Sequence, residues 1–67
     1  MSPPKKLTMT LRRLRTKRGL SQQGLAERSG LSREYVARLE TGQHNPSLAT
    51  LQKLAKALGV PVTALLE

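Results

Sequence analysis

The sequence predicts an all-α fold, a compact domain of five short helices without any strand, and three observations support this class. The apolar residues are mostly leucine, with thirteen Leu and three Val against no Ile, Phe or Trp. Leucine, which is not branched at Cβ, favours helices, whereas sheets draw on β-branched and aromatic residues. The leucines recur at helical spacing, and a glycine follows four of these segments, where a helix end is expected.

The length of 67 residues limits the classes of protein to consider. Such a chain forms one small domain that buries only about 60% of its unfolded surface, which leaves little room for an enclosed active site. We find no paired carboxylates, nucleophile–base set, Gly-rich phosphate loop or metal cluster, and no Cys. We therefore expect no enzyme, no cofactor and no metal site, and at this size no small-molecule effector.

The charge of the chain indicates a polyanionic partner. Twelve Lys or Arg stand against four Asp or Glu, a formal net charge of +8. The single aromatic residue cannot form the stacking platforms of single-strand binders, so duplex nucleic acid is the favoured partner. No apolar run approaches the roughly 18 residues of a membrane span, and we expect a cytoplasmic protein without a membrane partner.

The first helix is expected to follow a short tail. Residues 1–6 lack periodicity and are interpreted as a disordered basic tail, and residues 7–67 as the domain. Leucines at helical spacing then predict a helix that ends before Gly19. Its candidate N-cap is Thr8 or Thr10.

The next two helices are separated by an unusually short turn. Ser21 is the N-cap candidate of a helix that ends at Gly30, and Ser32 that of a helix running to about Thr41, with Gly42 beyond it. Only about three residues, 30–32, connect the two helices. A turn this short that contains glycine forces the axes to cross steeply, as in a helix-turn-helix.

Two more helices complete the chain. Residues 43–46 form a loop, after which Ser47 caps a helix with leucines at i, i+3, i+6 and i+10 that ends at Gly59. Pro61 begins a last turn or two of helix. The sequence has no internal repeat.

The third helix separates into two sides on a helical wheel. Val36, Leu39 and Glu40 share one side, and the opposite side is short and polar. That polar side and its flanks comprise Arg33, Glu34, Tyr35, Ala37, Arg38 and Thr41. Such a stripe suits a major groove, where Arg matches guanine, Glu accepts from cytosine and a small Ala allows close approach. The alternative is an ordinary solvated helix face.

Five segments together resemble the lambda-repressor-like, or Cro/Xre-type, helix-turn-helix family. They are Leu20-Ser21-Gln22-Gln23-Gly24-Leu25-Ala26, Gly30-Leu31-Ser32-Arg33, Leu39-Glu40-Thr41-Gly42, Asn45-Pro46-Ser47-Leu48 and Leu54-Ala55-Lys56-Ala57-Leu58-Gly59-Val60. The similarity covers about residues 7–66. Arg33-Glu34-Tyr35-Val36 followed by Asn45-Pro46-Ser47-Leu48 is most similar to the small controller proteins of restriction–modification systems.

The resemblance implies a set of DNA-binding residues. The start of the second helix would contact the DNA backbone or a base edge, the third would enter the major groove, and the loop beyond it would follow the backbone. These residues are Ser21, Gln22, Gln23, Ser32, Arg33, Glu34, Tyr35, Ala37, Arg38, Thr41, Gln43 and Asn45. For the three serines at helix starts, plain N-capping is the simpler role.

The resemblance also implies a structural ion pair between Arg15 and Glu40, which joins the first and third helices. Two positions depart from the family pattern. Gly24 stands where a polar or acidic helix former is usual, and Pro61 replaces a polar cap. His44 is expected to be exposed rather than a metal ligand, because no second ligand lies near it in the sequence.

The leading functional hypothesis is a sequence-specific transcriptional regulator that binds duplex DNA as a homodimer on a pseudo-palindromic operator. Val62, Leu65 and Leu66 are candidates for the dimer interface, or alternatively close the core, with Leu66 the better interface candidate. The second hypothesis is an antitoxin-type interaction module that also represses its own operon. A third is non-specific compaction of nucleic acid by charge alone.

Overall fold

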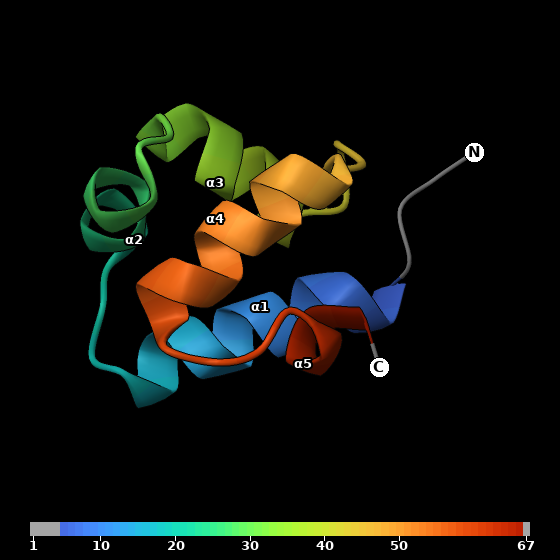
Figure 1. The fold of residues 1–67 in the computed structure, drawn as a ribbon. Coiled ribbons are helices and arrows are strands. Elements are labelled where there is room, and N and C mark those ends of the chain that lie inside the picture. The colour runs from blue at the N-terminus through green and yellow to red at the C-terminus, as the bar shows by residue number, and fades with distance from the viewer. Residues whose placement is uncertain (1–4, 67) are drawn as a thin grey trace.

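The computed structural model describes residues 5–66, which form five helices in the order the sequence predicts (Figure 1). These are α1 (Lys5–Lys17), α2 (Gln22–Ser29), α3 (Arg33–Glu40), α4 (Leu48–Leu58) and α5 (Thr63–Leu66). Within this part of the chain there is no strand. The all-α prediction is therefore confirmed, including the short connection between α2 and α3.

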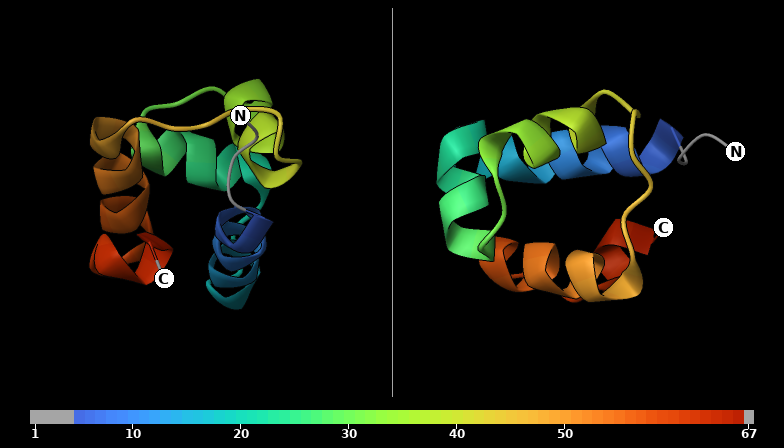
Figure 2. Two further views of the ribbon diagram at one scale, coloured as in Figure 1. Left: turned by 90° about the vertical axis from the view of Figure 1, so that its right-hand side faces the viewer. Right: turned by 90° about the horizontal axis from the view of Figure 1, so that it is seen from above.

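The helices surround one small core. Both views in Figure 2 place α1 and α4 on opposite sides of the molecule, with α2 and α3 joining them. Helix α5 returns the chain from α4 to α1 and contacts both. This arrangement leaves α3 with one face against the core and the other open to solvent.

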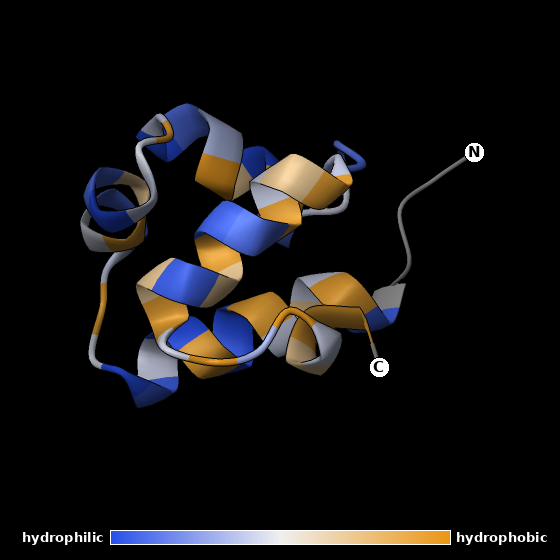
Figure 3. Ribbon diagram, in the orientation of Figure 1, coloured by the Kyte–Doolittle hydropathy of each residue, from blue (hydrophilic) through white to orange (hydrophobic). Residues whose placement is uncertain are grey.

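Leucine fills the core, as its abundance predicts. The apolar sides of the helices turn inward (Figure 3), and the largest side chains that are almost fully buried are Leu11, Leu25, Val36, Leu54, Leu58 and Leu65. Each helix supplies at least one of them. Leu31 in the turn between α2 and α3 packs against the same cluster.

Serine caps start three of the helices. The hydroxyls of Ser21, Ser32 and Ser47 accept the backbone N–H groups of the residues three positions on, at 2.9, 3.1 and 3.2 Å. Each such bond satisfies an N–H that has no partner inside its own helix. All three predicted caps are confirmed.

Helix α1 begins earlier than predicted. It starts at Lys5, so residues 5 and 6 belong to the helix rather than to the tail, and residues 1–4 lie outside the described residues. Leu7 is already buried, and lysine is a good helix former, so the turn that places Leu7 can extend to Lys5. Neither Thr8 nor Thr10 is a cap, because both lie inside the helix.

The C-terminal apolar residues divide between core and surface. Leu65 is 1% exposed and belongs to the core of the monomer rather than to its exposed surface. Its position in α5 points it between α1 and α4, the alternative considered from the sequence. Val62 packs partly against the core, while Leu66 is 58% exposed. Of the described helices, none is long and apolar enough to span a membrane.

Candidate nucleic-acid interface

The turn between α2 and α3 fixes the direction of α3. Gly30 adopts a left-handed conformation with φ of +73°, which glycine tolerates better than residues with a Cβ. The N–H groups of Gly30 and Leu31 both return to the Ala26 carbonyl, closing the end of α2. Ser32 then caps α3 at once, so no flexible residue separates the two helices.

Helix α3 has the two sides that the wheel predicts. Val36 is fully buried, Leu39 is 2% exposed, and both face the core. The opposite side presents a polar stripe whose residues are exposed, apart from the half-buried Ala37 and Tyr35. The members of this stripe are Arg33, Glu34, Tyr35, Ala37, Arg38 and Thr41. Two of its side chains are cationic and one is anionic, so the stripe is nearly neutral.

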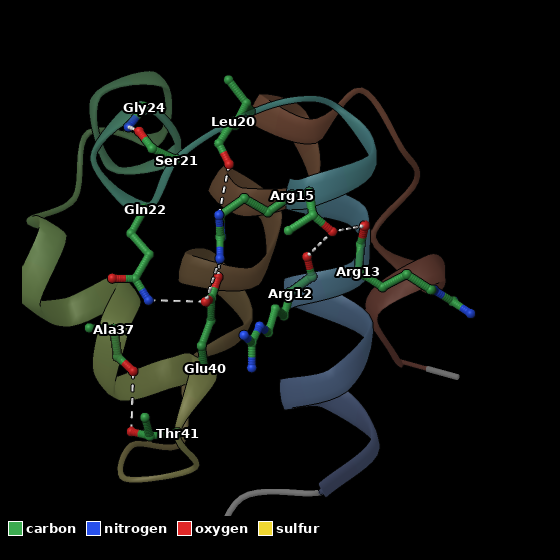
Figure 4. A network of polar contacts seen from close by, with 11 residues as sticks. Arg12, Arg13, Arg15, Leu20, Ser21, Gln22, Gly24, Ala37, Glu40 and Thr41 are labelled. Carbon is green, nitrogen blue, oxygen red and sulfur yellow. Dashed lines mark hydrogen bonds and ion pairs between the residues drawn. The ribbon is translucent and has the colours of Figure 1, made fainter.

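Glu40 is the polar residue on the inner side of α3, and it is paired. Arg15 donates from Nε to Oε2 at 2.6 Å and from Nη2 to Oε1 at 3.0 Å, and from Nη1 to the Leu20 carbonyl at 2.7 Å (Figure 4). Exposed fractions of 12% and 4% for the two side chains show that the pair is largely desolvated. The implied ion pair is present, and it ties α1 to both α3 and the segment before α2.

Gln22 joins this pair. Its Nε2 donates to Glu40 Oε1 at 3.1 Å, so the carboxylate holds the first residue of α2 as well as α1 (Figure 4). The sequence predicted that Gln22 contacts the DNA backbone or a base edge. It did not predict the hydrogen bond from Gln22 to Glu40. The second amide N–H and the amide oxygen make no hydrogen bond within residues 5–66, which leaves them for a ligand at the start of α2.

The start of α2 holds the remaining residues expected there. Ser21 is exposed, with its hydroxyl accepting from the Gly24 N–H. A Cβ on residue 24 would lie 3.3 Å from that hydroxyl, so a larger residue there would require the Ser21 side chain to shift by a few tenths of an ångström. Gln23 is exposed and donates to Glu27 at 3.0 Å.

The loop after α3 continues the same surface. Thr41 ends α3 and its hydroxyl donates to the Ala37 and Arg38 carbonyls, both at 3.2 Å. Gln43 and Asn45 are exposed. His44 is exposed as expected, but its ring also meets Tyr35 edge-on, with ring centroids 4.8 Å apart. The sequence did not predict this contact, which packs the loop against α3.

The site offers hydrogen-bond donors and positive charge rather than reactive groups. In residues 5–66 no cluster of three or more His, Cys, Asp or Glu side chains could hold a metal ion. The candidate residues lie at the start of α2, on the exposed stripe of α3 and in the loop beyond it. Free backbone N–H groups at helix starts favour the binding of phosphate. An α-helix such as α3 fits into the major groove of DNA.

A helix-turn-helix family model matches residues 11–65. The uncharacterized HTH-type transcriptional regulator y4dJ of Sinorhizobium fredii is 50% identical over 48 residues, which are 72% of this chain and 62% of that protein. The chain spans only part of such relatives, from 34% to 62% of the length of four of them.

Solved structures agree with the sequence comparison. The restriction–modification controller protein C.AhdI from Aeromonas hydrophila superposes with a TM-score of 0.88 at 50% identity, covering 90% of this chain and 91% of that one. The biofilm master regulator SinR, solved in complex with DNA, gives a TM-score of 0.87 at 31% identity over 91% of this chain and 98% of its own. These relatives are regulators and a controller protein, and they give the antitoxin alternative no support.

Proposed function

Because this chain belongs to the Cro/Xre-type helix-turn-helix family, with the family model matching residues 11–65, we propose that it binds duplex DNA sequence-specifically and regulates transcription. The observation that carries this proposal is the exposed polar stripe of α3, held at a fixed angle by a three-residue turn. As a regulator it acts in the cytoplasm by occupying its operator, without catalysis.

Helix α3 reads bases in the major groove. Arg33 and Arg38 offer guanidinium forks that match guanine O6 and N7, and Glu34 accepts from cytosine N4. Ala37 lies between them, and its small side chain lets the helix backbone approach the bases or a thymine methyl. The close likeness to a regulator solved in complex with DNA supports this placement.

The residues around α3 bind the phosphate backbone and fix the register. The backbone N–H groups at the starts of α2 and α3 point outward beside Ser21, Gln22, Gln23 and Ser32, and anions bind at such helix ends. Beyond the groove, further contacts to the phosphate backbone of the DNA come from Tyr35, Thr41, Gln43 and Asn45. Contacts of this kind supply affinity and orientation, while sequence preference comes from the groove.

The operator is pseudo-palindromic and the protein binds it as a homodimer. Dimers of helix-turn-helix proteins place their half-sites about 34–36 Å apart, one turn of DNA. Leu66, 58% exposed on α5, supplies an apolar contact for the second copy. Val62, which packs partly against the core, lies at the edge of this contact. Leu66→Ser would then weaken dimer formation in analytical ultracentrifugation while leaving the fold of the monomer unchanged.

Selection on random duplexes tests the proposal. The purified chain is expected to enrich one motif with two half-sites, which reports sequence preference, symmetry and spacing together. Enrichment of no motif would show the DNA-reading proposal to be wrong and favour binding by charge alone. Enrichment of a single half-site would retain base reading but contradict the homodimer.

A further inference from the structure

The outer face of α1 carries a second positively charged surface. It comprises the exposed residues Lys6, Met9, Arg12, Arg13 and Thr16. Two adjoining surface depressions of about 460 and 420 Å³ lie on it, and both are lined by Met9 and Arg13. Met9 is 65% exposed, the largest exposed fraction among the large apolar side chains of residues 5–66.

The fold does not account for this surface. Helix α1 contains no acidic residue, and Arg15–Glu40 is the one ion pair among the described residues. Lys6 lies near the N-terminal end of the helix, where positive charge opposes the macrodipole, and Arg13 and Lys17 repel each other at i, i+4 spacing. These cations cost stability, so their placement points to a binding role.

The outer face of α1 is separate from the DNA-reading stripe. Residues two apart lie about 200° apart around a helix, so Arg13 points away from the side on which Arg15 meets Glu40. Figure 4 shows Arg13 extending away from that pair. A duplex bound along α3 therefore leaves the depression lined by Lys6, Met9 and Arg13 uncovered.

The composition of the surface favours a protein segment over a second duplex. Phosphates match lysine and arginine but gain nothing from an exposed thioether at the centre of the face. An apolar centre with a charged rim is the pattern of protein interfaces, and methionine adapts its shape to an apolar partner. A second copy of this chain is a poor complement, because it has four Asp or Glu against twelve Lys or Arg.

We propose that the outer face of α1 docks an acidic, amphipathic segment of another protein, with an apolar side chain of the segment against Met9 and its carboxylates around Lys6 and Arg13. The cations steer the acidic segment to this face, and the contact with Met9 selects segments that also carry an apolar residue. Through it the DNA-bound protein contacts a second protein without releasing the groove.

Titration of the ¹⁵N-labelled full chain with a short synthetic peptide, in which glutamates surround one leucine, tests the docking surface. Amide shift changes are expected in residues 6–16 while those of residues 33–41 stay in place. The double variant Lys6→Gln/Arg13→Gln should bind the peptide about tenfold more weakly, since it removes two exposed charge pairs. The matched variant Lys53→Gln/Lys56→Gln removes the same charge from exposed positions of α4 and should change binding by less than about twofold.

Three outcomes would overturn the proposal. Shift changes centred on residues 33–41 would mean that the peptide imitates DNA. Equal binding of a peptide with serine in place of leucine, or by a Met9→Ser variant, would leave charge alone as the cause. A non-specific duplex that shifts residues 6–16 in place of the peptide would assign the face to nucleic acid. Failure of the DNA selection would leave this titration unaffected, because the peptide is tested on the free chain.

Discussion

Helices α1 and α3 both present arginines to solvent, but in different settings. On α3, Arg33 and Arg38 flank Glu34, and the stripe is nearly neutral. On α1, the exposed cations have no acidic residue in the same helix, and seven of the twelve basic residues of the chain lie in 5–18. Most of the net charge and the stripe proposed to read bases therefore lie on different helices. The total charge of the chain is therefore a poor guide to the position of the proposed DNA-reading stripe.

The largest expected effect comes from the pair that joins these two helices. Glu40→Ala should lower the free energy of unfolding by about 3–5 kcal/mol, because Arg15 is left largely buried without its partner. Urea denaturation measures this loss. The double variant Arg15→Met/Glu40→Leu should recover much of it. A double variant as unstable as Glu40→Ala would contradict the assignment of the loss to an unpaired charge.

Base reading should depend on α3 alone. Arg38→Ala should cost about 1–3 kcal/mol in binding to the selected operator and relax the preference at one base position. Arg28→Ala, an exposed arginine at the end of α2, is the matched control and should leave the preference intact. Competition binding with single-base operator variants measures both. If both variants relaxed the base preference, the result would contradict the proposal that the stripe on α3 alone reads bases.

A comparison of Ser32 with Ser47 separates the two roles of a helix-start serine, capping the helix and contacting phosphate. Ser32→Ala and Ser47→Ala should each lower stability by about 1 kcal/mol, because each removes the acceptor for a backbone N–H. Only Ser32→Ala is expected to weaken operator binding as well, since Ser32 adjoins the stripe of α3. Thermal unfolding and operator titration provide the two readouts. Equal operator affinity for the two variants would show that Ser32 caps α3 and makes no contact with phosphate.

The smallest effect is expected on α1. Lys6→Gln/Arg13→Gln should leave the slope of log K against log salt for operator binding changed by less than about one unit, because these cations lie away from the phosphates. Operator titrations at several salt concentrations measure the slope. A slope reduced by about two would place both residues on the DNA and contradict the division between α1 and α3.

Local sequence signals predicted most of the fold. Each of Ser21, Ser32 and Ser47 precedes a helix and caps it, and the wheel of α3 separated Val36 and Leu39 from the polar stripe correctly. These features depend on residues a few positions apart. The start of α1 was misplaced for the same reason, since Lys5 and Lys6 carry no helix-start signal.

Long-range contacts account for what the sequence could not predict. The bond from Gln22 to Glu40 and the contact of Tyr35 with His44 depend on how α2 and the loop pack on α3. Burial of Leu65 rather than Leu66 depends on the rotation of α5 between α1 and α4. In so short a helix, a rotation by one residue about the helix axis would bury Leu66 and expose Leu65. The spacing of the apolar residues alone does not determine this rotation.

The aromatic content of the chain has a spectroscopic consequence. Tyr35 is the sole aromatic residue of the Phe, Tyr and Trp types in the chain, and it lies on α3 with the His44 ring against its edge. All intrinsic near-ultraviolet fluorescence and circular dichroism therefore originate on α3, and none in the leucine side chains of the core. Emission from Tyr35 is thus a natural, label-free reporter of events at the stripe, and because Tyr35 also packs against the core, loss of the fold changes the same signal.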